Sequence, residues 1–191
     1  LSGQVLAYGD HRGLPELREL IVDDAPGCSA DHVLCTPGAA AALFFVATSV
    51  LSAGDHALVQ HTNYATNLET PRLLHADVQR IELRIEDGFA LDLDRLGAQV
   101  RPSTALISVT TPHNPTGTTL RADELHALVE LAERNSCWLL VDETYREMTH
   151  GEPLPMAASL SDRAISVSSV SKTYGLPGLR LGWVVTRHPE L

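Results

Sequence analysis

Residues 121–142 read RADELHALVELAERNSCWLLVD, and this stretch decides the fold class. Apolar residues recur at helical spacing in its first half, which predicts an amphipathic helix over residues 121–135. The apolar stripe consists of Leu125, Leu128, Val129 and Ala132. The short run WLLV that follows is continuously apolar, which is typical of a strand buried on both faces. A second apolar run, at residues 105–109, precedes the helix, so the stretch predicts a strand–helix–strand unit of a parallel sheet.

The same alternation extends in both directions along the chain. Short apolar strands are predicted at residues 33–36, 56–60, 78–83, 105–109, 138–141, 164–167 and 181–185. Helices are predicted at residues 15–24, 39–51, 65–75, 92–100 and 121–135. The helix at 39–51 is rich in alanine and apolar enough for burial on more than one side. We therefore predict an α/β fold with three layers, α/β/α, around a mostly parallel sheet.

Composition limits the class of protein and its partners. The chain has 191 residues, 44% hydrophobic and 20% charged, which indicates one packed domain, or one domain and part of a second. A formal net charge of -10 argues against nucleic acid or an anionic membrane as the main partner. No apolar run reaches the roughly 18 residues of a membrane span.

Cysteine usage and the chain ends add two expectations. The three cysteines, Cys28, Cys35 and Cys137, form no CxxC pair and are odd in number. They favour a reducing compartment, so we expect a cytoplasmic protein with no metal centre. The chain starts at Leu1 without a methionine and stops shortly after a predicted strand. We expect residues 1–191 to be an internal piece of a longer protein.

Chemically active residues gather where predicted strands end. In such folds the carboxyl ends of the strands meet at one edge of the sheet, where ligands bind. Four strand ends carry candidate groups: TPGAA at 36–40, HNPTG at 113–117, DETY at 142–145 and SSVSKTYGLPGLRLG at 168–182.

Each of these ends has a particular chemistry. The first opens the alanine-rich helix, whose free N–H groups can bind an anion. Asn114 precedes a proline, which favours an extended backbone and can aim its amide into a cleft. Asp142 ends an apolar strand, where a buried carboxylate needs a cationic partner or strong hydrogen bonds. Lys172 is the only lysine beside thirteen arginines, and only lysine can become a nucleophilic amine.

Taken singly, most of these segments could be a plain turn, a helix cap or a solvated loop. Taken together, they would bring an anion cradle, an amide, an acid and an amine to one crevice. That set suits a cofactor with a phosphate, a ring nitrogen and an aldehyde.

Residues 169–182, from Ser169 through Lys172 to Arg180 and Gly182, complete the pattern. In the order NPTG, DETY and this lysine segment, the chain resembles the cofactor-binding large domain of class I/II aminotransferases, the pyridoxal-phosphate enzymes of fold type I. The resemblance runs from Tyr8 to Gly182. It implies that the amino-terminal segment and the small domain of the family lie outside residues 1–191.

The resemblance also implies a role for each site residue. Lys172 would form the Schiff base with pyridoxal 5'-phosphate and later act as the general base. Asp142 would pair with the pyridine nitrogen, and Tyr145 and Asn114 would bind the phenolic oxygen of the ring. Tyr64 would stack on the ring. The phosphate ligands implied are Ser169, Arg180 and the helix-start residues Gly38, Ala39 and Ala40.

Tyr8 matches a tyrosine that reaches the phosphate of the neighbouring subunit, which implies a homodimer with shared active sites. Three positions depart from the family pattern. Ala40 lacks a hydroxyl that some members use on the phosphate, and Thr62 replaces a common proline. Asn67 stands where aspartate aminotransferase has a histidine behind the pyridine-binding acid, and we expect its amide to donate to Asp142.

The function implied is the transfer of an amino group between an amino acid and a 2-oxo acid. Two alternatives keep the same residues. One is another fold type I enzyme, a decarboxylase, lyase or cyclase, because the fate of the substrate depends on its pose. The other is the cofactor-binding domain of a transcription regulator, which a basic winged-helix segment upstream of Leu1 would reveal. The acyl-transferring branch of the fold usually has a histidine near the acid, and Tyr145 disfavours it.

Overall fold

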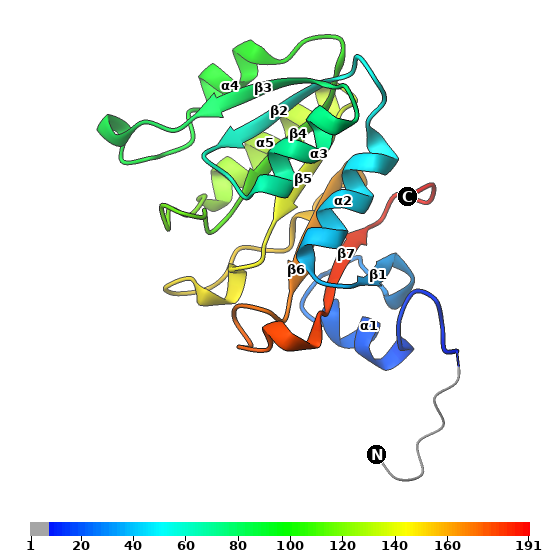
Figure 1. Ribbon diagram of the computed structural model, residues 1–191. Helices are drawn as coiled ribbons and strands as arrows, with labels where there is room; N and C mark the ends of the chain where they lie inside the picture. Colours follow the sequence, from blue (N-terminus) through cyan, green and yellow to red (C-terminus); the bar gives the residue numbers. More distant parts are fainter. Residues whose placement is uncertain (1–7) are drawn as a thin grey trace.

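The computed structural model describes residues 8–191 of the chain. Its centre is a seven-stranded sheet in the order β1-β7-β6-β5-β4-β2-β3 (Figure 1). The strands are β1 (Val33–Thr36), β2 (His56–His61), β3 (Asp77–Glu82), β4 (Thr104–Thr110), β5 (Trp138–Asp142), β6 (Ala164–Ser169) and β7 (Gly182–Thr186). Strands β2 to β6 are parallel, and β7 is antiparallel to both of its neighbours, β1 and β6. The prediction of a mostly parallel sheet is confirmed.

Helices cover both faces of this sheet. The α-helices are α1 (Pro15–Ile21), α2 (Ala39–Val50), α3 (Ala65–Leu73), α4 (Leu93–Gln99) and α5 (Ala122–Arg134). Short 3₁₀ helices occupy Ala30–His32, Ile85–Asp87, Arg146–Met148, Ala157–Ser159 and Pro177–Leu179. Helices α2 and α3 lie on one face, and α4 and α5 lie on the other (Figure 1). Among the described residues, no helix has the length and apolar character that a membrane crossing needs.

Alternating strand residues supply the two cores. Ile107 and Val109 of β4 pack with the α4–α5 side, whereas Leu106, the residue before Ile107, packs with the α2–α3 side. In β5 the same division separates Leu139 from Leu140. Successive side chains of a strand point to opposite faces, so a continuously apolar strand fills both cores at once. The predicted three-layer α/β/α architecture is confirmed.

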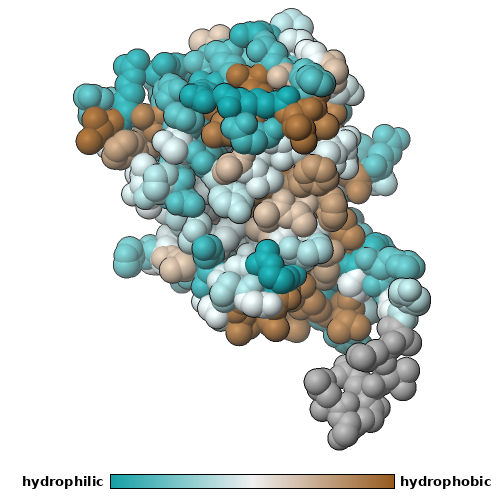
Figure 2. Space-filling view, in the orientation of Figure 1, coloured by the Kyte–Doolittle hydropathy of each residue, from teal (hydrophilic) through white to brown (hydrophobic). Residues whose placement is uncertain are grey.

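Helix α2 differs from expectation on one side. It buries Ala42, Leu43 and Ala47 against the sheet, but Phe44 and Phe45 are 43% and 41% exposed. Within residues 8–191, therefore, only one face of α2 is covered, and Figure 2 shows pale to brown, weakly to strongly hydrophobic surface over this helix. The small alanine side chains explain how α2 lies close to the sheet, while the aromatic pair points outward.

The edge formed by the carboxyl ends of the parallel strands also receives the start of β7. Gly182 is in register with both Ser169 at the end of β6 and Thr36 at the end of β1. Residues just before β7 therefore lie at the same edge as residues just after β5 and β6. This topology explains how positions 36–40 and 168–182 of the sequence come together.

Candidate active site

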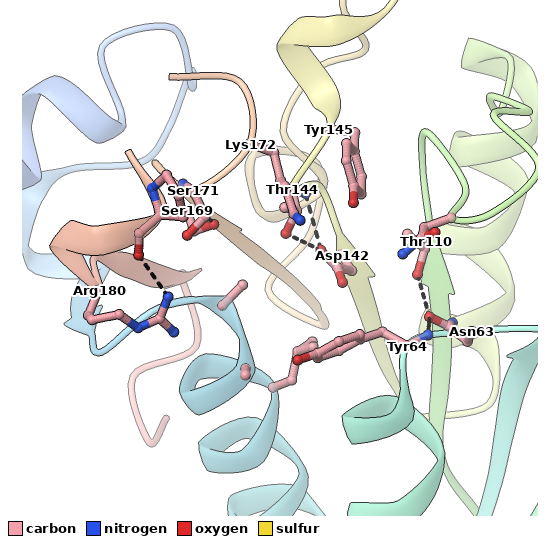
Figure 3. A pocket seen from close by; sticks show the side chains of 15 residues that line it. Asn63, Tyr64, Thr110, Asp142, Thr144, Tyr145, Ser169, Ser171, Lys172 and Arg180 are labelled. Carbon is pink, nitrogen blue, oxygen red and sulfur yellow. Dashed lines mark hydrogen bonds between the residues drawn. The ribbon is translucent and has the colours of Figure 1, made fainter. Parts of the chain in front are cut away.

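A cavity of about 220 Å³ opens at this edge (Figure 3). It brings together nine residues predicted from the sequence: Ala39, Ala40, Tyr64, Asn114, Asp142, Tyr145, Ser169, Lys172 and Arg180. It is also lined by six residues to which the sequence assigned no individual role: Leu43, Asn63, Thr110, Thr144, Ser171 and Pro177. The predicted convergence of four strand ends on one crevice is therefore observed.

Asp142 forms the acidic end of the cavity. It is the last residue of β5 and is 6% exposed. Its Oδ1 accepts hydrogen bonds from the Thr144 hydroxyl at 2.6 Å and from the Thr144 backbone N–H at 3.1 Å. Burial raises the pKa of Asp142, and the two bonds from Thr144 and the Asn67 amide act in the opposite direction. A carboxyl in this position favours a cation next to it, because a cation would offset the desolvation of the charged form.

Asn67 lies beside this acid but has a second neighbour. It is buried in the first turn of α3, and its side chain lowers the pKa of Asp142. Its Nδ2 donates a hydrogen bond to Asn63 Oδ1 at 3.1 Å. The expected hydrogen bond from the Asn67 amide to Asp142 is not found among the described residues, because the amide donates to Asn63 instead, and Asn67 acts on Asp142 only by lowering its pKa.

The start of α2 forms the opposite end of the cavity. The N-cap residue, Gly38, offers no side-chain cap, and the first turn carries no acidic residue. The Gly38 N–H donates to the Thr36 carbonyl at 2.7 Å and the Ala42 N–H to the Gly38 carbonyl at 3.3 Å, so the helix-start amides left for a ligand within residues 8–191 are those of Ala39, Ala40 and Ala41. Helix N-termini with free N–H groups favour phosphate.

Arg180 lies against this helix start. Its guanidinium donates to the Pro177 carbonyl at 3.0 Å and to the Pro37 carbonyl at 3.5 Å. Within residues 8–191, Arg180 forms no salt bridge, so its charge is not neutralised by a carboxylate. Arg180 has a φ of 52°, a left-handed conformation that few residues other than glycine adopt without strain.

Two glycines permit this close approach. A Cβ on Gly38 would lie 2.6 Å from Arg180 Nη2, and Gly38 has a φ of +90°. A Cβ on Gly182 would lie 2.5 Å from the Gly38 carbonyl carbon and 2.6 Å from the Ala39 nitrogen. The backbones of β7 and the α2 start are therefore in contact, and only glycine fits at these positions. The cradle fits a small, multiply charged anion such as a phosphate group.

Lys172 extends into the space between the two ends of the cavity, and Tyr145 lies near Asp142 on the side away from Arg180 (Figure 3). Lys172 is exposed in residues 8–191 and forms no salt bridge there. Ser169, buried at the end of β6, accepts a long hydrogen bond of 3.4 Å from the Ser171 N–H. The loop thus presents an amine and two hydroxyls beside the start of α2.

Asn114 reaches the cavity from a loop that a buried histidine organises. His113 Nε2 lies 2.6 Å from the Thr62 carbonyl, and its Nδ1 lies 2.8 Å from Thr116 Oγ1. Burial lowers the pKa of His113, so the neutral ring is favoured, with one nitrogen donating to Thr62. His113 was quoted in the sequence motif, but no sequence signal distinguished its structural role.

Glu143, the neighbour of Asp142, points away from the cavity into the sheet. Its Oε1 accepts hydrogen bonds from the Ala157 N–H at 2.7 Å and from Ser166 Oγ at 2.9 Å. Burial raises the pKa of Glu143 to about 7, against the effects of these two bonds and of the nearby Arg146. Glu143 connects β5 to β6 and to the Ala157–Ser159 helix. Of these two neighbouring acids, Asp142 therefore lines the cavity, whereas Glu143 holds the fold together.

Two of the predicted site residues do not line the cavity. Gly38 lies behind Arg180, where it allows the contact described above. Tyr8 is fully exposed and contributes nothing to the cavity of its own chain. Its predicted role on a neighbouring subunit stays a prediction.

Comparison with known proteins gives a consistent result. Residues 1–191 match the family described as aminotransferase class I and II. The chain is 31% identical to the arginine–pyruvate transaminase of Pseudomonas aeruginosa, covering 93% of this chain and 47% of that protein. It is 29% identical to the aspartate aminotransferase of Pyrococcus horikoshii, with the same shares covered.

Solved structures show the same likeness. A PLP-dependent aminotransferase from Streptococcus suis superposes with a TM-score of 0.93 at 33% identity, covering 98% of this chain and 50% of that one. Aspartate aminotransferase from Thermus thermophilus, solved with maleate, gives 0.90 at 25% identity, covering 96% and 50%. The chain thus spans about half the length of the relatives it matches.

Proposed function

Because the chain belongs to the class I and II aminotransferases, we propose that residues 1–191 are the cofactor-binding large domain of a pyridoxal-phosphate-dependent aminotransferase. The reaction proposed is the transfer of an amino group between an amino acid and a 2-oxo acid. The observation that carries this proposal is the cavity itself. It has a buried carboxyl at one end, an uncapped helix start with an arginine at the other, and the sole lysine between them.

Pyridoxal phosphate, when bound, supplies an electron sink that stabilises the negative charge left at the substrate Cα when its proton departs. The residues fit such a group at three points. The Ala39 and Ala40 amides, Ser169 and Arg180 would bind the phosphate, whose two charges offset the unpaired guanidinium. Tyr64 would pack on the ring face.

Asp142 would keep a proton on the ring nitrogen. Its carboxyl is desolvated, and a protonated ring nitrogen beside it lowers its pKa and stabilises both charges. Each pKa unit by which Asp142 raises the pKa of the ring nitrogen corresponds to about 1.4 kcal/mol in favour of the protonated ring. Tyr145 and Asn114 would hydrogen-bond the phenolic oxygen and fix the ring orientation.

Lys172 would hold the cofactor through its amine and then act on the substrate. When free, Lys172 Nζ would accept a proton from the substrate Cα and would donate it to a second carbon nearby. An amine on a flexible stem suits this role, because it must reach two carbon atoms in turn.

The complete protein is proposed to be a homodimer with shared active sites in a reducing compartment, the cytoplasm. The support for sharing is Tyr8, which is fully exposed and does not line the cavity of its own chain. The support for the compartment is that Cys28, Cys35 and Cys137 are all free thiols.

Borohydride reduction of the cofactor-loaded, full-length protein tests the proposal. The cofactor should be fixed to one peptide, which contains Lys172, and Lys172→Ala should lose both the label and the amino transfer. Label on another peptide, or transfer that survives Lys172→Ala without an added amine, would contradict the assignment. A screen of amino donors, followed by the absorbance of the cofactor in half-reactions, would then identify the substrate.

A further inference from the structure

We propose that Asn63 is a positioning residue of this site, which fixes the Tyr64 ring and the Asn67 amide through a single oxygen atom. The inference rests on the proposed function, because Tyr64 and Asn67 matter only if a ring lies between them and Asp142. Sequence patterns did not single out Asn63, although it lines the cavity.

Asn63 Oδ1 accepts three hydrogen bonds from three directions. The Tyr64 backbone N–H donates at 2.7 Å, the Thr110 hydroxyl at 3.1 Å and Asn67 Nδ2 at 3.1 Å. Figure 3 shows the Asn63 amide between Thr110 and the Tyr64 backbone. One amide oxygen thus joins the residue before α3, the first turn of α3 and the carboxyl end of β4.

The three hydrogen bonds to Asn63 Oδ1 act locally, because other contacts already connect the strands. The Gln60 side chain accepts from the Thr110 N–H at 2.7 Å, and His113 binds the Thr62 carbonyl at 2.6 Å. These contacts hold β2, β4 and the loop before Tyr64 without Asn63. The three donors at Asn63 Oδ1 therefore act chiefly on where Tyr64 and Asn67 point.

The amino group of the Asn63 side chain indicates that the oxygen, and not the nitrogen, is the functional atom of this amide. Asn63 Nδ2 is buried and has no hydrogen-bond partner among the described residues. An unpaired buried donor is unfavourable, so the amino group does not account for an asparagine at this position. An acceptor that can take three bonds is what the position requires, and aspartate offers the same acceptor geometry.

The test uses the full-length protein loaded with pyridoxal phosphate. Asn63→Ala removes the acceptor, and we expect the visible circular dichroism of the bound cofactor to fall by at least about half and its dissociation constant to rise roughly tenfold. Asn63→Asp keeps the acceptor and should restore most of the dichroism band. Thr110→Val removes one of the three donors and should shift both readouts in the same direction by less.

Controls separate positioning from folding. Asn135→Ala removes a side-chain bond to Leu131 at the far end of α5 and should leave both readouts unchanged. The melting temperature of the cofactor-free protein should stay near that of the wild type in Asn63→Ala. An unchanged dichroism band and affinity in Asn63→Ala would overturn the proposal. Equal loss in Asn63→Ala and Asn63→Asp with a lower melting temperature would also overturn it, in favour of a structural role. Wild-type protein that binds no pyridoxal phosphate would instead refute the proposed function, and this inference with it.

Discussion

The Asp142 carboxyl lies at the end of β5, and within residues 8–191 Thr144 is its only hydrogen-bond donor of good geometry. Thr144 alone does not offset its burial, because the pKa of Asp142 remains raised. We predict that Asp142→Ala loses activity by a factor on the order of 10³, since an unprotonated ring accepts electrons poorly. Single-turnover half-reactions measure this loss. Near-normal turnover in Asp142→Ala would refute this role for the acid.

Asn67→Ala should have a smaller effect on the same reaction. The Asn67 amide donates to Asn63, so its stabilisation of the charged form of Asp142 should not exceed that of one hydrogen bond, on the order of 1 kcal/mol, and about 1.4 kcal/mol corresponds to a factor of ten in rate. The expected loss is therefore about tenfold, measured beside Asp142→Ala under the same conditions. A loss as large as that of Asp142→Ala would mean that Asn67 does more than adjust the acid.

Glu143 gives a prediction for stability and not for catalysis. Its pKa is about 7 in the folded protein, against 4.5 for the unperturbed group, so the folded state binds more protons between these two pH values. Stability contributed by the protonated form is complete below about pH 4.5 and is lost as the pH rises to about 7.

Glu143→Gln keeps the acceptor for Ala157 and Ser166 but cannot ionise. We predict that its unfolding free energy, relative to that of the wild type, rises by about 3 kcal/mol between pH 4.5 and 7. Urea unfolding of the cofactor-free protein at several pH values measures the difference. Parallel pH profiles for the two proteins would show that Glu143 titrates normally.

At the scale of elements, the junction of β7 and α2 is the tightest constraint on the site. Gly182→Ala would place a Cβ within 2.6 Å of two backbone atoms of residues 38 and 39, and neither can move alone. We predict a loss of about 2 kcal/mol or more of stability and at least tenfold weaker cofactor binding, because the helix start and Arg180 move apart. Gly178→Ala is the matched control, since nothing lies within 4 Å of its Cβ position.

Thermal melting and cofactor titration of both glycine variants test this account. If Gly178→Ala were as damaging as Gly182→Ala, flexibility of the loop would be the cause, and not the close approach of the two backbones. If neither had an effect, the contact between β7 and the α2 start would not be required for the site.

Secondary structure was largely predictable because buried strands and amphipathic helices have distinct periodicities. β1 was predicted at its observed bounds, and α5 to within one residue at each end. The predicted helix at 65–75 ends at residue 73, because His75 has a φ of 59°, which stops a helix. The antiparallel direction of β7 was not predicted, since strand direction depends on the connection and not on the strand itself.

The site was predictable where a residue carries chemistry at a strand end. Asp142 and Lys172 are of this kind. Thr144 and Asn63 were missed, because they act by hydrogen bonds to neighbours whose positions only the fold defines. No periodicity distinguishes such a residue from an ordinary turn residue.

At the scale of the whole molecule, the segment after Tyr8 is held firmly to the domain. Arg18 is buried at 3% exposure and donates to the Gly13 and Ala30 carbonyls and to Asp10 Oδ2, at 3.1, 2.7 and 2.8 Å. An arginine with several satisfied donors fixes this turn more firmly than one surface ion pair would. Tyr8 therefore projects into solvent from an anchored base, two residues before Asp10. A fully exposed tyrosine on an anchored base suits contact with a second copy of the chain.

Mixed dimers test whether that contact completes an active site. A dimer of one Tyr8→Phe chain and one Lys172→Ala chain should keep one intact site if Tyr8 serves its neighbour, because the chain with Lys172 then receives Tyr8 from its partner. Its activity should be about half that of the wild type, and above that of either parent. If Tyr8 served its own chain, or no site at all, mixing would restore nothing beyond the Tyr8→Phe level. Purifying the mixed dimer through two different affinity tags removes both parental dimers. Its activity then lies above that of the Tyr8→Phe dimer if Tyr8 serves its neighbour, and does not exceed that activity otherwise.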